Sequence, residues 1–421
     1  MKTRIPMKLL AALTALCLLL GFGVFAMADE EDAPPAESDT ALVIEGAGMP
    51  YYNPDMTRAL NSGLAFKDNG QFKILVLSDL DIGIAPYPAM IKSIDYMIKD
   101  TQPDLIVLNG DVTRKQSSVL GITGSGVSIA WICDMIPGNI PFTVTFGEND
   151  ALLDVSKNNY LTRYQRYGNF LGYDDMPVID GVANHNLFIY GNAGAAKKVE
   201  NVAFNLWMLD TNMDGLYRLQ ADWYGAKEND VIYLELGKAG FDYIIPSAIF
   251  THKSLLETAG VAGGAKMLSN MGEFGDVRAA ISSHNRTVSN TPKALQSWDG
   301  TRTSNVAFLG TPGMAYTGAG DRATRGGTLV TLTLNTPFAA GTAADVSVSV
   351  QQKIAWEYFN DDNPALAGNV GSRHAFYQAG VSAFFGPPAS LIGWMLGLFI
   401  DKYETAYKIT QFWGDTFNFM L

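Results

Sequence analysis

Short apolar runs recur along the middle of the chain, and each stops at a small group of polar residues. Runs of this kind, rich in β-branched side chains and bounded by turn formers, are typical of buried strands. We expect strands at residues 73–77, 105–108, 142–146, 204–209, 243–250 and 277–281, and three more at 305–309, 328–334 and 346–350. Residues 88–99 place apolar side chains at helical spacing. A helix joining two buried strands makes a parallel βαβ unit, so the pattern predicts one large α/β domain over residues 65–352.

The polar groups at these strand ends contain candidate metal ligands. In open α/β sheets, ligands bind beyond the carboxyl ends of the strands. The side chains there that offer a ligand atom are those of Asp79, Asp81, Asp111, Glu148, His252 and His284. Any one of them alone is more often structural, but clustered carboxylates repel one another unless a cation compensates their charge. Mixed carboxylate and imidazole ligation suits Zn, Mn, Fe or Mg, so the set predicts a divalent metal.

The first 28 residues have the composition of a signal peptide. A basic start precedes an apolar run over residues 9–25, and Ala-Met-Ala at 26–28 is a small-residue cleavage site. The alternative is that this segment stays in the membrane as an anchor. We expect export, with the protein secreted or held in the cell envelope. Residues 29–64 are then an acidic linker and a lead-in to the domain.

The net charge of the chain indicates which kinds of partner are disfavoured. Without the first 28 residues, the chain keeps 27 basic against 42 acidic residues, a net charge near −15. Such acidity argues against nucleic acid or an anionic membrane surface as a partner, because both repel a negatively charged protein.

Residues 353–421 form an apolar and aromatic extension, which we expect to be helical. The apolar stretch at 389–400 is too short to span a bilayer. Two alternatives stay open for this extension. Either it packs on the domain, or residues 389–421 lie at a membrane surface as a peripheral contact.

The order of the strand-end motifs resembles that of the calcineurin-like metallophosphoesterases, and among them the secreted branch related to purple acid phosphatases. The motifs are SDLD (78–81), NGDVT (109–113), FGEND (146–150), FTHKSLLE (250–257) and SSHNR (282–286). Family members carry D-x-H, G-D-x, G-N-H-D, a lone His and G-H-x-H in this order. The resemblance covers about residues 70–335.

The resemblance implies a sandwich of two mixed β-sheets flanked by helices, with the three last strands together in the second sheet. It also implies a pair of metal ions that clamp a phosphate ester and activate a water molecule. The substrate would be a phosphate mono- or diester, or the partner would be phosphate itself.

This chain departs from the family motifs at several positions. Asp81 stands where the family has a ligand His, and Asn149 where it has the catalytic His. Arg286 stands where it has the last ligand His, so Asn149 and Arg286 are our candidate catalytic residues. Glu148 replaces a ligand Asn and still offers oxygen.

These changes fall mainly on one of the two metal sites. The resemblance implies one ion held by Asp111, Glu148, His252 and His284. A second ion would need Asp79, Asp81, Asp111 and Arg286, and a guanidinium has no lone pair for a metal. We therefore expect one ion, with two as the alternative. Arg286 is expected either to form ion pairs with Asp79 and Asp81 or to hold a substrate phosphate.

Two functions stay open at this point. The first is an exported metal-dependent phosphoesterase, weakened because Asp81, Asn149 and Arg286 replace family histidines. The second is a non-catalytic protein of the cell envelope that keeps the fold and binds metal or phosphate. His185 and His374 match no ligand motif, and we expect them to be surface or packing residues.

Export can be tested at the N-terminus. We expect the mature chain to begin at Asp29 and to be recovered outside the cytoplasm, because cleavage follows the small residues at 26–28. N-terminal sequencing of the fractionated protein measures this. An intact Met1 in the membrane fraction would show instead that the apolar segment is kept as an anchor.

Overall fold

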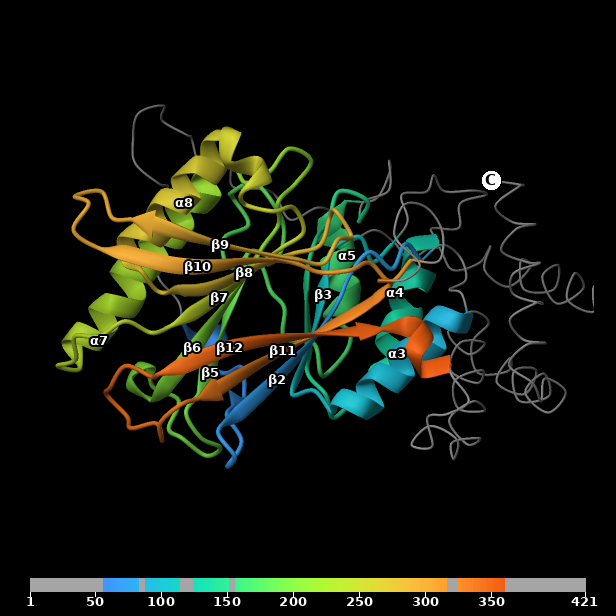
Figure 1. Cartoon of the computed structure of the whole chain (residues 1–421), viewed down its shortest axis with the longest axis horizontal. Helices are drawn as coiled ribbons and strands as arrows, with labels where there is room; N and C mark the ends of the chain where they lie inside the picture. Colours follow the sequence, from blue (N-terminus) through green and yellow to red (C-terminus); the bar gives the residue numbers. More distant parts are fainter. Residues whose placement is uncertain (1–55, 83–87, 114–123, 151–155, 316–323, 360–421) are drawn as a thin grey trace, which may run out of the picture.

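The computed structural model describes residues 56–82, 88–113, 124–150, 156–315 and 324–359 of the chain. Two β-sheets pack face to face, and helices cover their outer faces (Figure 1). The predicted signal peptide, most of the linker and the extension beyond residue 359 lie outside these residues, as does His374.

The larger sheet has seven strands and is mixed. Its strand order is β1 (Leu64–Ala65), β5 (His185–Tyr190), β6 (Val202–Leu209), β7 (Ser247–Thr251), β8 (Val277–Ser282), β10 (Thr303–Gly310) and β9 (Ser289–Gln296). Strands β6, β7, β8 and β10 run parallel to one another. Strand β5 pairs antiparallel with β6, and β9 pairs antiparallel with β10.

The smaller sheet has five strands, in the order β12 (Val346–Ile354), β11 (Gly326–Leu334), β2 (Gln71–Leu77), β3 (Leu105–Asn109) and β4 (Phe142–Thr145). Strands β2, β3 and β4 are parallel, whereas β11 is antiparallel to both β2 and β12. Both sheets are therefore mixed, and the predicted fold class is confirmed.

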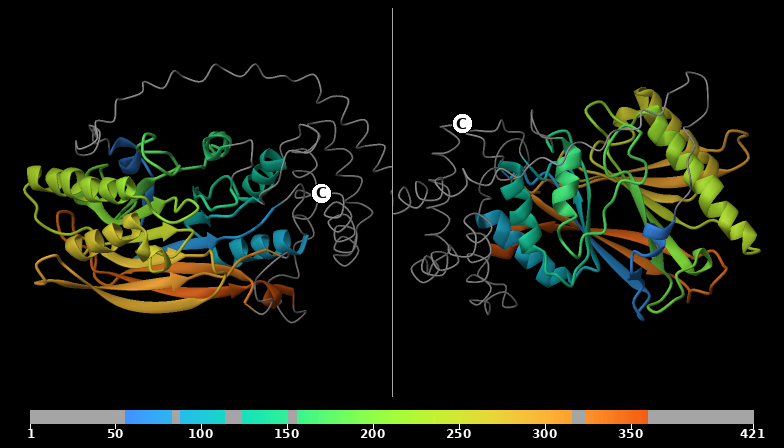
Figure 2. Two further views of the ribbon diagram at one scale, coloured as in Figure 1. Left: turned by 90° about the horizontal axis from the view of Figure 1, so that it is seen from above. Right: turned by 180° about the vertical axis from the view of Figure 1, so that it is seen from behind.

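The helices form the outer layers of the sandwich, and Figure 2 shows these layers from above and from behind. The α-helices are α2 (Thr57–Leu60), α3 (Pro88–Thr101), α4 (Gly124–Met135), α5 (Lys157–Tyr164), α6 (Arg218–Ala226), α7 (Leu234–Lys238) and α8 (Ala262–Phe274). Shorter 3-10 turns are η1 (Val199–Asn201), η3 (Glu257–Gly260) and η4 (Ala355–Phe359), and η2 (Lys227–Tyr233) is a π-helical segment. No helix in the described ranges is long and apolar enough to cross a membrane.

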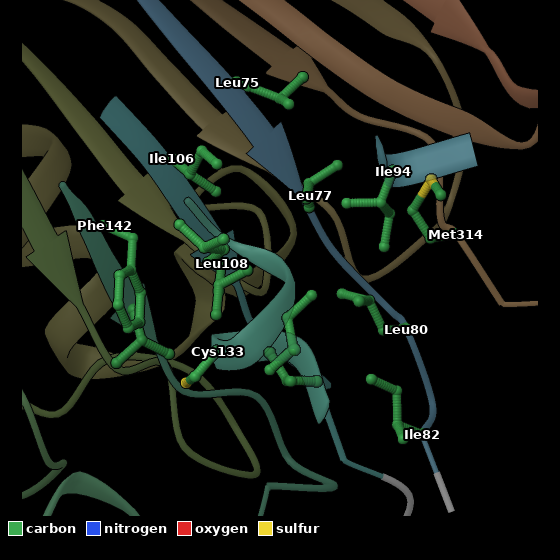
Figure 3. Close-up of a cluster of buried hydrophobic side chains, with 14 of the residues drawn as sticks. Leu75, Leu77, Leu80, Ile82, Ile94, Ile106, Leu108, Cys133, Phe142 and Met314 are labelled. Carbon is green, nitrogen blue, oxygen red and sulfur yellow. The ribbon is translucent and has the colours of Figure 1, made fainter. Parts of the chain in front are cut away.

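Alternate residues of the central strands face two different cores. Ile74 and Val76 of β2 lie between the two sheets. Leu75 and Leu77 point to the other side, where side chains of α3 and α4 meet them (Figure 3). Since successive side chains of a strand point to opposite faces, a strand buried on both faces is apolar at most positions. This explains why the predicted strands appear as continuous apolar runs.

The strand predictions are confirmed for most of the chain, with four differences. The run at 243–250 is wrong at its start, because β7 begins only at Ser247. Strands β5 and β9 were missed, as was the two-residue strand β1. Strand β9 is polar and exposed at almost every position, so no apolar pattern marks it, and its pairing with β10 holds it in the sheet.

The grouping of the last three strands was also wrong. Strand β10 pairs parallel with β8 in the seven-stranded sheet, whereas β11 pairs antiparallel with β2 in the five-stranded sheet. Strand β10 lies between β8 and β9 in that sheet. Strand β11 therefore crosses to the other sheet, and each sheet contains strands from both ends of the domain.

Contacts reach beyond both expected domain boundaries. Helix α2 packs against β5, and η4 packs against α3. The hydroxyl of Tyr358 donates a hydrogen bond to Asp100 Oδ2 at 2.8 Å, and Lys353 forms an ion pair with the same oxygen at 2.9 Å. The first residues of the predicted extension, up to Phe359, thus belong to the packed domain.

His185 is a packing residue inside the sandwich, which is one of the two roles that we expected for it. Its side chain is fully buried, and its Nδ1 lies 2.6 Å from the carbonyl oxygen of Ala183. A carbonyl only accepts, so Nδ1 carries the proton, and Nε2 accepts from the Thr143 hydroxyl at 2.7 Å. Burial lowers the pKa of His185 to about 4.

This histidine should make the protein less stable in mild acid. Its pKa is about 4 in the folded chain and about 6.5 in an unfolded one, so protons bind preferentially to the unfolded state. The contribution of His185 to the free energy of unfolding is complete above pH ~6.5. It falls by about 3 kcal/mol as the pH approaches ~4. Urea unfolding at pH 7 and pH 4.5 measures it. We expect a shallower pH dependence in His185→Gln, and equal slopes would contradict the assignment.

Candidate metal centre

The predicted ligands lie in loops that directly follow strands of both sheets. Asp79 and Asp81 follow β2, Asp111 follows β3 and Glu148 follows β4, all from the smaller sheet. His252 follows β7 and His284 follows β8 of the larger sheet. The two groups meet where Asp111 Oδ2 lies 3.2 Å from His252 Nε2. The carboxyl ends of parallel strands in both sheets thus face one site.

Both oxygens of the Asp111 carboxylate accept hydrogen bonds from Asn149. Its Oδ1 accepts from the backbone N–H of Asn149 at 2.8 Å, and its Oδ2 accepts from the Asn149 side-chain amide at 2.6 Å. Although burial acts against ionisation, the neighbouring His252 and the Asn149 donors hold the pKa of Asp111 below its ordinary value. Asp111 is therefore ionised, and Asn149 fixes the orientation of both its oxygens.

His252 carries the matching positive charge. Burial disfavours the charged imidazole, but hydrogen bonding and attraction to Asp111 raise the pKa of His252 above its ordinary value. Its Nδ1 lies 3.1 Å from the carbonyl oxygen of Asn109, which orients the ring. Without a metal, the centre of the site is thus an ion pair between Asp111 and His252.

Arg286 joins the two carboxylates that follow β2. Its Nε donates to Asp79 Oδ1 at 3.0 Å, and its Nη2 donates to Asp81 Oδ2 at 2.7 Å. The predicted ion pair is confirmed, with one guanidinium bridging two carboxylates. The arginine is 15% exposed and Asp79 only 1%, so little water screens the first of these contacts.

The outer part of the site contains a residue that sequence reasoning missed. Lys253 Nζ lies 2.6 Å from Glu148 Oε2, while Glu148 Oε1 is 3.9 Å from His284 Nδ1. His284 Nδ1 is in turn 3.3 Å from His252 Nε2. The position of Lys253 next to His252 in the chain was the one signal available, and it does not reveal a contact with Glu148.

Asp150 holds the loops together from beneath. It is buried and accepts from the backbone N–H groups of Asp111, Gly147 and Thr113 at 2.7, 2.8 and 3.0 Å. It was not among the predicted site residues, because it makes its bonds to backbone. A Cβ on Gly147 would collide with the Asp111 side chain, so glycine is needed for this close approach.

Backbone strain is concentrated at this site. Of the seven non-glycine residues with positive φ in the described ranges, four belong to the site, namely Asp79, Asp81, Asp111 and Arg286, with φ between 47° and 52°. Such conformations cost of order 1 kcal/mol each and cluster at functional sites. The bonds from Asp150 and Asn149, together with the Arg286 ion pairs, offset this cost.

Comparison with known proteins identifies the family. A model of the calcineurin-like phosphoesterase family matches residues 72–285, just over half of the chain. The chain belongs to the calcineurin-like phosphoesterase family.

A curated relative of this phosphoesterase-family chain is the probable inactive purple acid phosphatase 28 of Arabidopsis thaliana. The two are 24% identical over 251 residues, which cover 52% of this chain and 62% of the relative, so the match spans less than two thirds of that protein. Among solved structures, GAP50, the anchor in the inner membrane complex of Plasmodium, is 12% identical, with 67% of this chain and 85% of that chain covered and a TM-score of 0.39. A dimetal phosphatase from Danio rerio is 10% identical, with 67% and 99% covered and a TM-score of 0.39.

Members of this family use divalent metals, and the donor set of this chain fits one such ion. Asp79 Oδ2 is buried and has no hydrogen-bond partner within the described part of the chain. Burial accordingly raises the pKa of Asp79 to about 7, against the positive charges of His252 and Arg286. Asp79, Asp111 and His252 each offer a ligand atom, and these atoms all lie within 4.8 Å of one another.

The site residues therefore fall into three groups. Asp111 and His252 form the centre, and His284 adjoins them through His252. Asp79 and Asp81 are bridged by Arg286, so a second ion at that position would have to displace a guanidinium. Glu148 contacts Lys253 through Oε2, while its Oε1 lies 3.9 Å from His284 Nδ1. The ligand and catalytic roles of all these residues stay predictions.

Removing the Arg286 charge should destabilise the fold. Arg286→Met leaves two carboxylates without their bridging cation, and breaking such a buried pair costs about 3 kcal/mol or more. The matched control is Arg302→Met, because Arg302 pairs with Glu273 at the surface with a side chain 57% exposed, where loss costs below ~1 kcal/mol. Urea unfolding at neutral pH compares both variants with Arg286→Lys, which keeps the charge. Equal losses in the two methionine variants would contradict the bridging role.

Proposed function

We propose that this chain is a phosphoesterase of reduced activity that works outside the cytoplasm with one divalent ion. The observation that carries the proposal is the position of His252 Nε2, 3.2 Å from Asp111 Oδ2 and 3.3 Å from His284 Nδ1. Ligand atoms about 2.1 Å from one ion are separated by roughly 3.0–3.4 Å, so His252 Nε2 has the spacing of a neighbouring ligand to Asp111 Oδ2 and to His284 Nδ1.

In this proposal the residues of the site have different roles. Asp111, His252 and His284 would hold the ion, and Glu148 would join them through Oε1. When bound, the ion supplies a Lewis acid for the phosphate and an activated water. Asn149 keeps Asp111 in place through its hydrogen bonds. Arg286 keeps Asp79 and Asp81 paired, where the family has the second ion.

The expected substrates are phosphate mono- or diesters with good leaving groups. The family acts on phosphate esters, and its catalytic histidine protonates the leaving group. An amide such as that of Asn149 cannot donate a proton near neutral pH, and losing one general acid typically costs 10²–10⁴-fold in rate. Aryl phosphates need little help at the leaving oxygen, so they should be hydrolysed more readily than alkyl phosphates.

One observation favours a second candidate function, a non-catalytic protein that binds metal or phosphate in the cell envelope. Arg286 and Lys253 already lie against three of the site's carboxylates, and His252 against the fourth. Each of the four carboxylates thus has a cationic side chain beside it without any ion. The curated relative from Arabidopsis thaliana is also named as probably inactive.

Metal content and turnover together test the proposal. We expect about one equivalent of divalent metal per chain after mild dialysis, because Arg286 stands at the other position, and slow hydrolysis of an aryl phosphate that a chelator abolishes. Elemental analysis and steady-state kinetics measure these quantities. Two equivalents would show that Arg286 does not exclude the second ion, and metal binding without any turnover would establish the second candidate.

Variants that restore family histidines provide the comparison. Asn149→His alone should gain little, since the second metal position stays filled by Arg286. The triple variant Asp81→His, Asn149→His, Arg286→His should gain far more than the single change, because residues that act as one unit are strongly non-additive. A triple variant no faster than the single one would contradict this account.

A further inference from the structure

Lys253 places a positive charge in the outer part of the site. It directly follows His252, and its side chain is 15% exposed. Its ammonium lies 2.6 Å from Glu148 Oε2 and also donates to the carbonyl oxygen of Met213. The exposure of Lys253 equals that of Lys353, which pairs with Asp100, and is well below the 68% and 60% of Lys198 and Lys238.

The loop after β6 positions this lysine. The backbone N–H of Lys253 donates to the hydroxyl of Thr211 at 3.0 Å, and Thr211 is buried. Asp210, which precedes Thr211, forms an ion pair with Lys157 at 2.7 Å and accepts from the backbone of Asn212 at 2.9 Å. The loop is therefore fixed at several points, and Lys253 is held beside Glu148 by it.

Glu148 faces a cation on one side and the metal ligands on the other. Its Oε2 contacts Lys253, and its Oε1 lies 3.9 Å from His284 Nδ1. A divalent ion at His284 would attract the same carboxylate and repel the ammonium, since like charges a few ångströms apart interact strongly in a partly buried site. Lys253 and the ion thus compete for Glu148.

We propose that Lys253 occupies Glu148 in the metal-free protein, yields it when the ion binds, and then contacts the phosphate group of the substrate. This inference rests on the proposed function. Lysine suits the role because its ammonium is a compact charge on a flexible stem, which can turn from a carboxylate to a phosphate oxygen. Arg286 cannot take this role without leaving Asp79 and Asp81. Lys253 is therefore a substrate-positioning residue that this chain supplies.

Lys253→Gln should move two binding constants in opposite directions. Zn²⁺ should bind the full-length variant about three- to tenfold more tightly, because its competitor for Glu148 is gone. Inorganic phosphate should bind the Zn²⁺-loaded variant about tenfold more weakly, because the cation that contacts it is gone. Lys253→Arg should keep phosphate binding. Isothermal titration calorimetry measures both constants without relying on turnover.

Two controls separate this role from a purely structural one. Lys266→Gln removes a partly buried lysine that pairs with Asp222 and lies over the Trp298 ring, so both constants should stay unchanged. In a Glu148→Gln background, Lys253→Gln should no longer tighten Zn²⁺ binding, because the carboxylate for which the two cations compete is absent.

Each outcome decides between the two proposals. Equal Zn²⁺ and phosphate affinities in wild type and Lys253→Gln would overturn this inference and leave the single-ion phosphoesterase standing. Weakening of both constants would also overturn it, since it indicates a structural lysine. If neither wild type nor Lys253→Gln binds Zn²⁺, both proposals fail. Binding by the variant but not by wild type would support the competition directly.

Discussion

The structure depends on how four carboxylates at the ends of its strands are compensated. Asp79, Asp81, Asp111 and Glu148 are brought together by loops that follow parallel strands, and such a cluster is unfavourable unless positive charge lies within it. The chain supplies that charge from its own side chains, namely Arg286, His252 and Lys253. Every one of these carboxylates has a cationic partner, and the strained loop conformations persist because these pairs and the bonds from Asp150 hold them.

Compensation by side chains and compensation by metal have different chemical consequences. A guanidinium neutralises Asp79 and Asp81 but has no orbital to accept electrons from a phosphate oxygen or a water molecule. Arg286 therefore preserves the charge balance at that position and gives up Lewis-acid chemistry. The other half of the site differs, because His252 and Lys253 can yield their carboxylates to an ion by losing a proton or by moving a flexible stem. In the proposed function, stability and reactivity are thus divided between the two halves of one site.

The sequence predicted the parts of this molecule that packing makes periodic. Strands buried on both faces are mostly apolar, so β2, β3 and β6 were predicted, and each candidate ligand was found because it directly follows a predicted strand. Strand β9 was not visible, because exposed polar residues carry no pattern and its place comes from pairing with β10. Lys253 and Asp150 were not predicted as site residues for a related reason. Their contacts with Glu148 and with the backbone of Asp111 join segments whose proximity only the folded sheets create.

In the loop that carries Asn149, the side chain at this position can differ while the backbone conformation of the loop is kept. Asp150 fixes the backbone of this loop through the N–H groups of Gly147 and Asp111, and neither bond involves the side chain of residue 149. The amide of Asn149 therefore points to Asp111 within a frame that other residues maintain. An imidazole placed there would still face a site in which Arg286 is paired with Asp79 and Asp81. The chemistry of the loop is thus set by its neighbours across the site, and its shape by Asp150 beneath it.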